Sequence, residues 1–106
     1  MALDDIDLAN LDEVIHGRVR LGIMTVLAGD EGVEFNRLKA KLGLTDGNLS
    51  VHLRKLEEAG YVAIDKRFVD RKSQTTAKIT GAGRKAFVAY LDAMDALVRE
   101  ARSAHG

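Results

Sequence analysis

The stretch LTDGNLSVHLRKLEEAGYV, residues 44–62, decides the fold. Thr45 is a typical helix N-cap, because its hydroxyl can accept hydrogen bonds from the free backbone amides of a first turn. Gly60 is a typical residue at which a helix stops. Apolar residues recur between them at i, i+4 and i+7, on one narrow helix face, and these are Leu49, Leu53 and Leu56. The pattern predicts a helix over about residues 46–59 that buries this leucine face.

The opposite face of this helix is small or polar near its N-terminus. The major groove of DNA admits an α-helix, and small residues let the helix approach the base edges. Asn48 can form two hydrogen bonds with adenine, Ser50 can donate or accept one, and Val51 can touch a thymine methyl group. Basic residues farther along suit phosphates or guanine. The predicted DNA contacts of the helix are Asp46, Gly47, Asn48, Ser50, Val51, His52, Arg54 and Lys55.

Two helical patterns precede this helix. Residues 11–28 carry apolar side chains at helical spacing, and turn residues follow at 29–32. Residues 36–42 form a second, short helical pattern that ends at a tight break at 43–44. The segment 33–35 fits either a short strand or the first residues of the short helix. A short helix, a glycine-containing turn and a longer helix are typical of a helix-turn-helix.

A basic hairpin follows. Residues 61–64 begin a strand of β-forming residues, residues 75–80 form its return strand, and the connecting stretch 66–74 contains four basic residues. Such a hairpin beside a groove-binding helix can reach phosphates or the adjacent minor groove. Its predicted DNA contacts are Lys66, Arg67, Asp70, Arg71, Lys72 and Ser73. The whole pattern predicts a winged helix-turn-helix, a mainly α fold with a small β-hairpin.

The length of 106 residues fits one domain, with the helix-turn-helix at about 35–60, the wing at 61–80 and a last helix at 81–102. A hydrophobic share of 46% and a charged share of 30% exclude a disordered chain. No apolar run reaches the ~18–20 residues of a membrane span. The absence of cysteine excludes disulfides, thiol catalysis and cysteine-bound metals. The first residues lack the pattern of a signal peptide, so we expect a cytoplasmic protein.

The formal net charge of zero, from 16 basic and 16 acidic residues, hides an uneven distribution. Residues 1–13 carry five acidic side chains and no basic one. Residues 14–85 carry fourteen basic and eight acidic side chains, a net charge of +6, whereas residues 86–106 have a net charge of −1. The predicted DNA contacts all lie in the basic part, as binding to phosphates favours. We expect the acidic N-terminal segment to lie away from the DNA-facing side.

Residues 44–62, together with VDRKSQTTAKITGAGR at 69–84, resemble winged-helix transcriptional regulators of the MarR and ArsR type. The resemblance covers about residues 14–100 and is strongest to small stand-alone winged-helix DNA-binding proteins. It implies that Arg71 at the wing tip enters the minor groove and that Asp70 holds it by an ion pair. Narrow A·T-rich minor grooves attract arginine, which agrees with that role. A phosphate or base contact by Ser50 is implied as well.

The resemblance also implies a homodimer held by the terminal helices. Thr80 can cap the last helix, and the apolar stripe of that helix, together with the N-terminal segment, exceeds what one small domain covers. The predicted interface residues are Leu8, Leu11, Ile15, Phe87, Tyr90, Leu91, Met94, Leu97, Val98 and Ala101. We therefore expect a homodimeric, sequence-specific DNA-binding regulator that acts as a repressor at a pseudo-palindromic operator.

Other classes of function have less support in the sequence. His16, His52 and His105 show no metal-ligand spacing, and neither a phosphate-binding glycine loop nor a catalytic triad pattern is present. We expect no enzymatic activity, no cofactor and no metal, and the sequence assigns no small-molecule effector. The remaining alternative is a winged helix that binds protein or RNA, because a fold does not determine a function. The basic wing beside a helix of small residues favours double-stranded DNA over that alternative.

Overall fold

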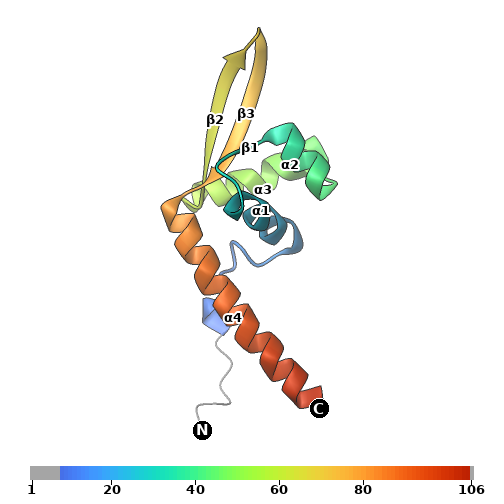
Figure 1. The fold of residues 1–106 in the computed structure, drawn as a ribbon, viewed down its shortest axis with the longest axis vertical. Coiled ribbons are helices and arrows are strands. Elements are labelled where there is room, and N and C mark those ends of the chain that lie inside the picture. Colours follow the sequence, from blue (N-terminus) through green and yellow to red (C-terminus); the bar gives the residue numbers. More distant parts are fainter. Residues whose placement is uncertain (1–7, 106) are drawn as a thin grey trace.

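The computed structural model describes residues 8–105 and has the predicted winged-helix architecture. Three short helices form the body of the domain, while the β-hairpin and the last helix extend from it at opposite ends (Figure 1). The elements in order are a 3-10 turn η2 (Leu8–Asn10), α1 (Arg18–Ala28), β1 (Val33–Glu34), α2 (Phe35–Leu42), α3 (Asp46–Glu58), β2 (Val62–Val69), β3 (Lys72–Ile79) and α4 (Gly81–His105). Most of the acidic segment whose position we predicted lies outside the described residues.

A three-stranded antiparallel sheet joins the wing to the helices. The strand order is β1-β3-β2, so β3 is the central strand. Val33 lies opposite Ala77, and Val62 lies opposite Ile79. All four side chains are buried, which anchors the base of the hairpin in the core. The sequence left two readings for the segment 33–35, and each holds for part of it: residues 33–34 form the short strand β1, and Phe35 begins α2.

The first helix is shorter than the predicted helix over residues 11–28. It begins at Arg18, and the residues before it form a turn. The Asp12 carboxylate accepts hydrogen bonds from the backbone amides of Val14 (2.8 Å) and Ile15 (3.3 Å). An aspartate that bonds to its local backbone competes with helix formation, so the prediction of one continuous helix is wrong. The turn brings Ile15 into the core, where it is fully buried.

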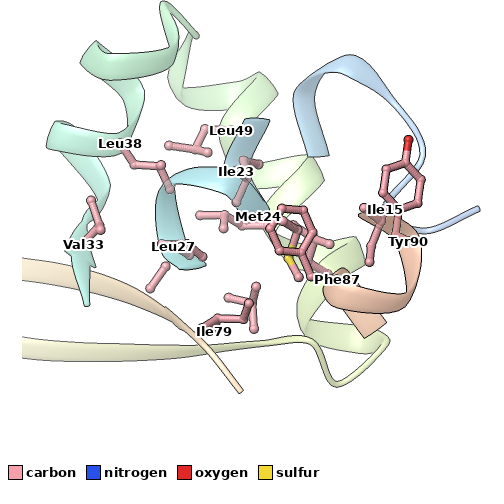
Figure 2. Packing of buried hydrophobic residues seen from close by; sticks show 14 residues of the cluster. Ile15, Ile23, Met24, Leu27, Val33, Leu38, Leu49, Ile79, Phe87 and Tyr90 are labelled. Carbon is pink, nitrogen blue, oxygen red and sulfur yellow. The ribbon is translucent and has the colours of Figure 1, made fainter. Parts of the chain in front are cut away.

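The core lies between the helices of the body and the base of the sheet (Figure 2). The predicted leucine face of α3 is confirmed, because all three of its leucines are buried there. Burying a leucine stabilises a fold by about 1.5–3 kcal/mol, which makes this face the main anchor of α3. The buried hydrophobic residues are Ile15, Ile23, Met24, Leu27, Val33, Leu38, Leu49, Leu53, Leu56, Val62, Ala77, Ile79, Phe87 and Tyr90.

The first turn of α4 is packed against the chain that follows α3. Thr80 is the predicted N-cap: its hydroxyl accepts from the Gly83 amide (2.9 Å) and donates to the Gly60 carbonyl (2.6 Å). The Thr80 amide donates to the carbonyl of Tyr61 (3.0 Å). A Cβ added to Gly83 would lie 2.1 Å from the Tyr61 carbonyl oxygen, so only glycine fits there. These contacts set the direction in which α4 leaves the domain.

The C-terminal part of α4 extends beyond the body of the domain (Figure 1). The described chain measures 61 × 25 × 21 Å. Its radius of gyration of 16.1 Å exceeds the ~13 Å of a compact chain of about 100 residues. η2 packs beside α4, but within residues 8–105 no α4 side chain after Tyr90 is buried. Much of this long helix is therefore open to another molecule.

The predicted interface residues fall into two groups. Ile15, Phe87 and Tyr90 are buried in the protomer's own core, where Figure 2 shows Ile15 beside Tyr90. Because their side chains are already covered within one protomer, the prediction that they lie in a dimer interface is corrected. Leu11 and Met94 pack partly against the same core. The helical spacing could not separate these residues from exposed ones, because both groups recur with the same period. The predicted members that remain exposed are Leu8, Leu91, Val98 and Ala101, with Leu97 partly exposed.

Candidate nucleic-acid interface

A tight turn holds α3 at the surface. Gly43 ends α2 in a left-handed conformation (φ +64°), which glycine adopts without strain, and the Leu44 amide donates to the Lys39 carbonyl (3.0 Å). Thr45 caps α3 as predicted, with its hydroxyl accepting from the Asn48 amide (3.2 Å). The two caps leave only three residues between the helices. The helix-turn-helix is thus built from local interactions that the sequence itself specifies.

The outward face of α3 is open, as the sequence predicts. Val51, an apolar residue in the middle of this face, is 50% exposed. A Cβ added to Gly47 would have no heavy atom within 4 Å, so the first turn of the helix can be approached closely. The exposed members of the predicted set are Asp46, Gly47, Asn48, Ser50, Val51, Arg54 and Lys55.

Two members of the predicted set have partners within the protein. The Asp46 carboxylate accepts from the Lys39 ammonium group (2.6 Å), and so holds a lysine of α2 beside the start of α3. His52 is partly buried, and its Nδ1 lies 2.9 Å from a guanidinium nitrogen of Arg20 in α1. Burial, followed by the positive charges of Arg20 and Lys55, lowers the pKa of His52 below its ordinary value. The imidazole is therefore neutral near pH 7.

The wing lies where the sequence predicts it, but its two strands are longer than predicted. β2 and β3 pair along their whole length, so the stretch 66–74 is mostly strand and not a loop. Only Asp70 and Arg71 connect the strands, with φ of +52° and +67°. Positive φ at both residues is typical of a two-residue hairpin turn, whose twist matches the twist of the antiparallel strands that it connects. Positive φ costs a non-glycine residue roughly 1–2 kcal/mol, so Arg71 is held at the tip under strain.

The side chains of the wing alternate between two faces. Lys66 and Phe68 share the face of the buried Val62, whereas Arg67 lies on the opposite face. There the Arg67 guanidinium pairs with the Asp65 carboxylate at 2.6 Å. The two neighbouring cations that the sequence predicts as DNA contacts therefore face different directions, and only Lys66 lies on the side of the core helices.

The tip of the wing differs in one respect from what the family resemblance implies. Asp70 and Arg71 are both exposed, but within residues 8–105 they form no ion pair with each other. The other predicted contacts at the tip, Lys72 and Ser73, are exposed as well. The Arg71 guanidinium, without an acidic partner among the described residues, is available to bind an anion.

A hollow of about 590 Å³ lies between α3 and the wing. Ser50 and Arg54 line it from α3, and Lys66 and Thr75 line it from the hairpin. The two cations outnumber the single carboxylate of the hollow, that of Glu57. Together with the two hydroxyl groups they suit a phosphodiester backbone, which accepts hydrogen bonds and carries negative charge. The remaining lining residues are Phe35, Leu53, Glu57 and Ile64.

The sequence reasoning missed two residues of this surface. Phe68 in the wing is 81% exposed, and a lone aromatic residue among charged neighbours in a hairpin is a signal that could have indicated it. Arg20 of α1 is the second, and it is not among the residues that the sequence predicts to matter for DNA binding. Its contact with His52, 32 residues later, has no signal in the local sequence because it depends on how α1 packs against α3.

His16 also has a side-chain partner, which lies in α4. His16 Nδ1 lies 2.8 Å from the Tyr90 hydroxyl, which links the N-terminal turn to α4. Within residues 8–105, no three His, Cys, Asp or Glu side chains are grouped so that they could hold a metal ion. In the same part of the chain, no helix combines the length and the apolar character that crossing a membrane requires.

Comparisons with known proteins agree with this geometry. A family model described as a winged helix DNA-binding domain matches residues 19–98, most of the chain. The chain belongs to this family. An uncharacterised protein of Methanocaldococcus jannaschii is 47% identical to this winged helix over 79 residues, which cover 74% of this chain and 86% of that protein.

Two solved structures extend the comparison. The transcriptional regulator homologue of Pyrococcus horikoshii OT3 is 31% identical to this winged helix, with a TM-score of 0.73, over 87% of this chain and 96% of that one. A protein of Bacillus cereus ATCC 10987, described as a MarR-like transcription regulator, is 23% identical, with a TM-score of 0.65, over 88% of this chain and 70% of that one. Both structures show that the chain has the winged-helix fold that the sequence predicts.

Proposed function

We propose that this winged helix is a sequence-specific regulator of transcription that binds double-stranded DNA. The observation that carries the proposal is an exposed, small-residue face of α3 beside a basic wing. In the proposed complex, residues 46–58 enter the major groove and residues 66–73 lie against the flanking minor groove. Membership in a family of DNA-binding domains supports the proposal.

The proposed contacts divide between base recognition and backbone binding. Asn48 and Val51, exposed in the first half of α3, read base edges by hydrogen bonding and apolar contact. Arg54 and Lys66, on either side of the hollow between α3 and the wing, hold one phosphodiester strand. Arg71 at the wing tip enters the minor groove. Base contacts then determine sequence preference, and the cations supply most of the affinity.

We further propose that the protein is a homodimer and represses transcription by occupying a pseudo-palindromic operator. Support comes from three large apolar side chains on η2 and α4, because Leu8, Leu91 and Val98 are 65%, 44% and 39% exposed. If a second copy covers these side chains, apolar surface is removed from water. This stabilises the dimer by about 25 cal/mol for each Å² of apolar surface that is buried. Two-fold symmetry would place the two half-sites about one helical turn (~10 bp), or a multiple of it, apart.

The first experiment is a random-site selection with the purified chain, followed by binding titrations on the selected duplex across salt concentrations. Each phosphate contact adds about −0.9 to the slope of log affinity against log salt. The basic residues proposed to neutralise phosphates in each protomer, by direct contact or, for Arg71, from within the minor groove, are Arg54, Lys55, Lys66, Arg71 and Lys72. A dimer is therefore expected to show a slope of up to roughly −9. A lack of salt-sensitive binding to any duplex would refute the proposal, and a stoichiometric protein or RNA partner would then favour the alternative.

Two variants separate the proposed roles. Arg71→Ala should weaken binding to selected and unselected duplexes alike, by roughly tenfold or more, because it removes a charge-assisted contact. Asn48→Ala should instead change the preferred base at one position of each half-site. Arg99→Ala is the matched control, because Arg99 is an exposed α4 residue that pairs with Asp95 on its own helix. An Arg71→Ala protein that binds like the Arg99→Ala control would contradict the assignment of the wing.

A further inference from the structure

Arg20 of α1 connects the N-terminal turn to α3. Its Nε donates to the carbonyl oxygen of Val14, and a terminal guanidinium nitrogen lies 3.5 Å from the carbonyl oxygen of Glu13. The other terminal nitrogen lies 2.9 Å from Nδ1 of His52. All three nitrogens of one guanidinium are thus engaged, two by the turn and one by the histidine of α3. The group is held in place from both sides.

This contact determines where His52 carries its proton. A guanidinium has only donors and stays charged, so Nδ1 of His52 must accept through its lone pair. A neutral imidazole has a single ring proton, which then lies on Nε2. The lowered pKa of His52 favours the same neutral ring. Nε2 makes no hydrogen bond with any of residues 8–105, so its N–H remains available.

His52 lies where such a donor is useful. Residues three or four apart on a helix are neighbours, so Asn48, His52 and Lys55 form one row along α3. Asn48 and Lys55 are exposed, and His52 is partly exposed between them. The row borders the face that we propose enters the major groove. The acceptors that DNA offers at its major groove are phosphate oxygens, purine N7 and guanine O6.

Building on the proposed DNA binding, we propose that Arg20 is a positioning residue that holds His52 as an Nε2–H donor for an acceptor on the DNA. Arg20 itself does not touch the DNA in this arrangement. Without it, the neutral ring populates both tautomers and loses the partner that fixes its orientation. The donor is then present in only part of the population, and the affinity for DNA falls.

A spectroscopic experiment tests the first half of the proposal without DNA. Long-range proton–nitrogen correlation spectra of the full chain at pH 7.5 report which imidazole nitrogen carries the proton. The parent protein should show His52 with its proton on Nε2, and Arg20→Met should show a mixture of tautomers. A parent His52 that is cationic, or that carries its proton on Nδ1, would overturn the proposal. This result is independent of whether the protein binds an operator.

A matched pair of substitutions tests the second half. His52→Asn puts an acceptor near the position of Nδ1 but does not reach that of Nε2, whereas His52→Gln puts an amide N–H near Nε2. His52→Asn should lose roughly threefold to tenfold in affinity for the selected duplex, the value of one hydrogen bond, and His52→Gln should lose less. Equal losses in the two variants would contradict donation from Nε2.

A double-mutant cycle separates positioning from a merely structural role. Arg20→Met should lower affinity in the parent background and have little further effect in the His52→Asn background, because the donor is already absent there. Equal losses in both backgrounds would mean that Arg20 acts through the fold, which would overturn the proposal. The thermal midpoint of each variant is measured alongside. A His52→Asn loss shared by all duplexes identifies a phosphate acceptor, and a loss confined to the selected site identifies a base edge.

Discussion

The substitution Gly83→Ala should damage this protein far more than its position on a helix indicates. Alanine is the better helix former, by about 1 kcal/mol in a helix interior. At residue 83, however, the new Cβ would lie 2.1 Å from the carbonyl oxygen, 2.8 Å from the carbonyl carbon and 2.9 Å from the Cα of Tyr61. Ordinary contacts begin near 3.4 Å, so α4 and the backbone of Tyr61, which follows α3, must separate by more than 1 Å.

The obstacle is backbone, which cannot rotate away as a side chain can. The separation stretches the Thr80 hydrogen bonds to Gly60 (2.6 Å) and Tyr61 (3.0 Å) and disturbs the packing of Phe87 one turn later. Overpacking costs typically 1–3 kcal/mol, and we expect a loss near the upper end, about 3 kcal/mol. For a domain of this size, that loss lowers the thermal midpoint by roughly 10–20 °C.

The assay is urea and thermal denaturation at matched protein concentrations, with Gly81→Ala as the control. Gly81 lies two residues earlier, at the start of α4, and a Cβ there meets no heavy atom within 4 Å. Gly81→Ala should leave stability unchanged or raise it by up to about 1 kcal/mol. The reasoning is refuted if Gly83→Ala is as stable as the parent, or if the two variants lose the same amount.

Three further predictions concern the dimer, the histidine and the wing. Leu91→Asp combined with Val98→Asp should convert the proposed dimer into a folded monomer in sedimentation analysis, because both side chains are exposed on one protomer; an unchanged mass would contradict the interface. Because the folded pKa of His52 is lowered, its stabilising effect is present above the unfolded value of 6.5 and is lost as the pH falls through the folded value. Between pH 7.5 and 5, urea denaturation should therefore show a larger loss of stability for the parent than for His52→Gln, and an equal loss would argue against this. Phe68→Ser should leave the thermal midpoint unchanged, since the ring is 81% exposed, yet weaken DNA binding in a titration; unchanged binding would remove Phe68 from the interface.

Local features of this protein could be predicted from its sequence. The caps at Thr45 and Thr80, the stop at Gly43 and the leucine face of α3 all depend on residues within one or two helical turns of each other. Such interactions form in nearly the same way wherever the segment lies. The helix-turn-helix, the exposed face of α3 and the presence of a basic hairpin therefore follow from spacing and residue type alone.

Other features depended on contacts that no local pattern encodes. The apolar stripe of α4 includes Phe87 and Tyr90, which the protomer buries, and Leu91 and Val98, which it leaves exposed. The period of a helix repeats for both groups, and only the direction of α4, set by the fit of Gly83 against Tyr61, decides between them.

The same holds for the candidate site. The polar residues of the wing indicate a loop, but they form strands that pair along their whole length. The backbone hydrogen bonds between β2 and β3 stabilise these strands despite the polar side chains. Arg20 meets His52 only because α1 packs against α3. The sequence thus determined which elements form and which residues each presents, since these depend on neighbours along the chain. The tertiary structure decided which of those residues are covered, paired or left open, because burial and hydrogen bonding depend on neighbours in space.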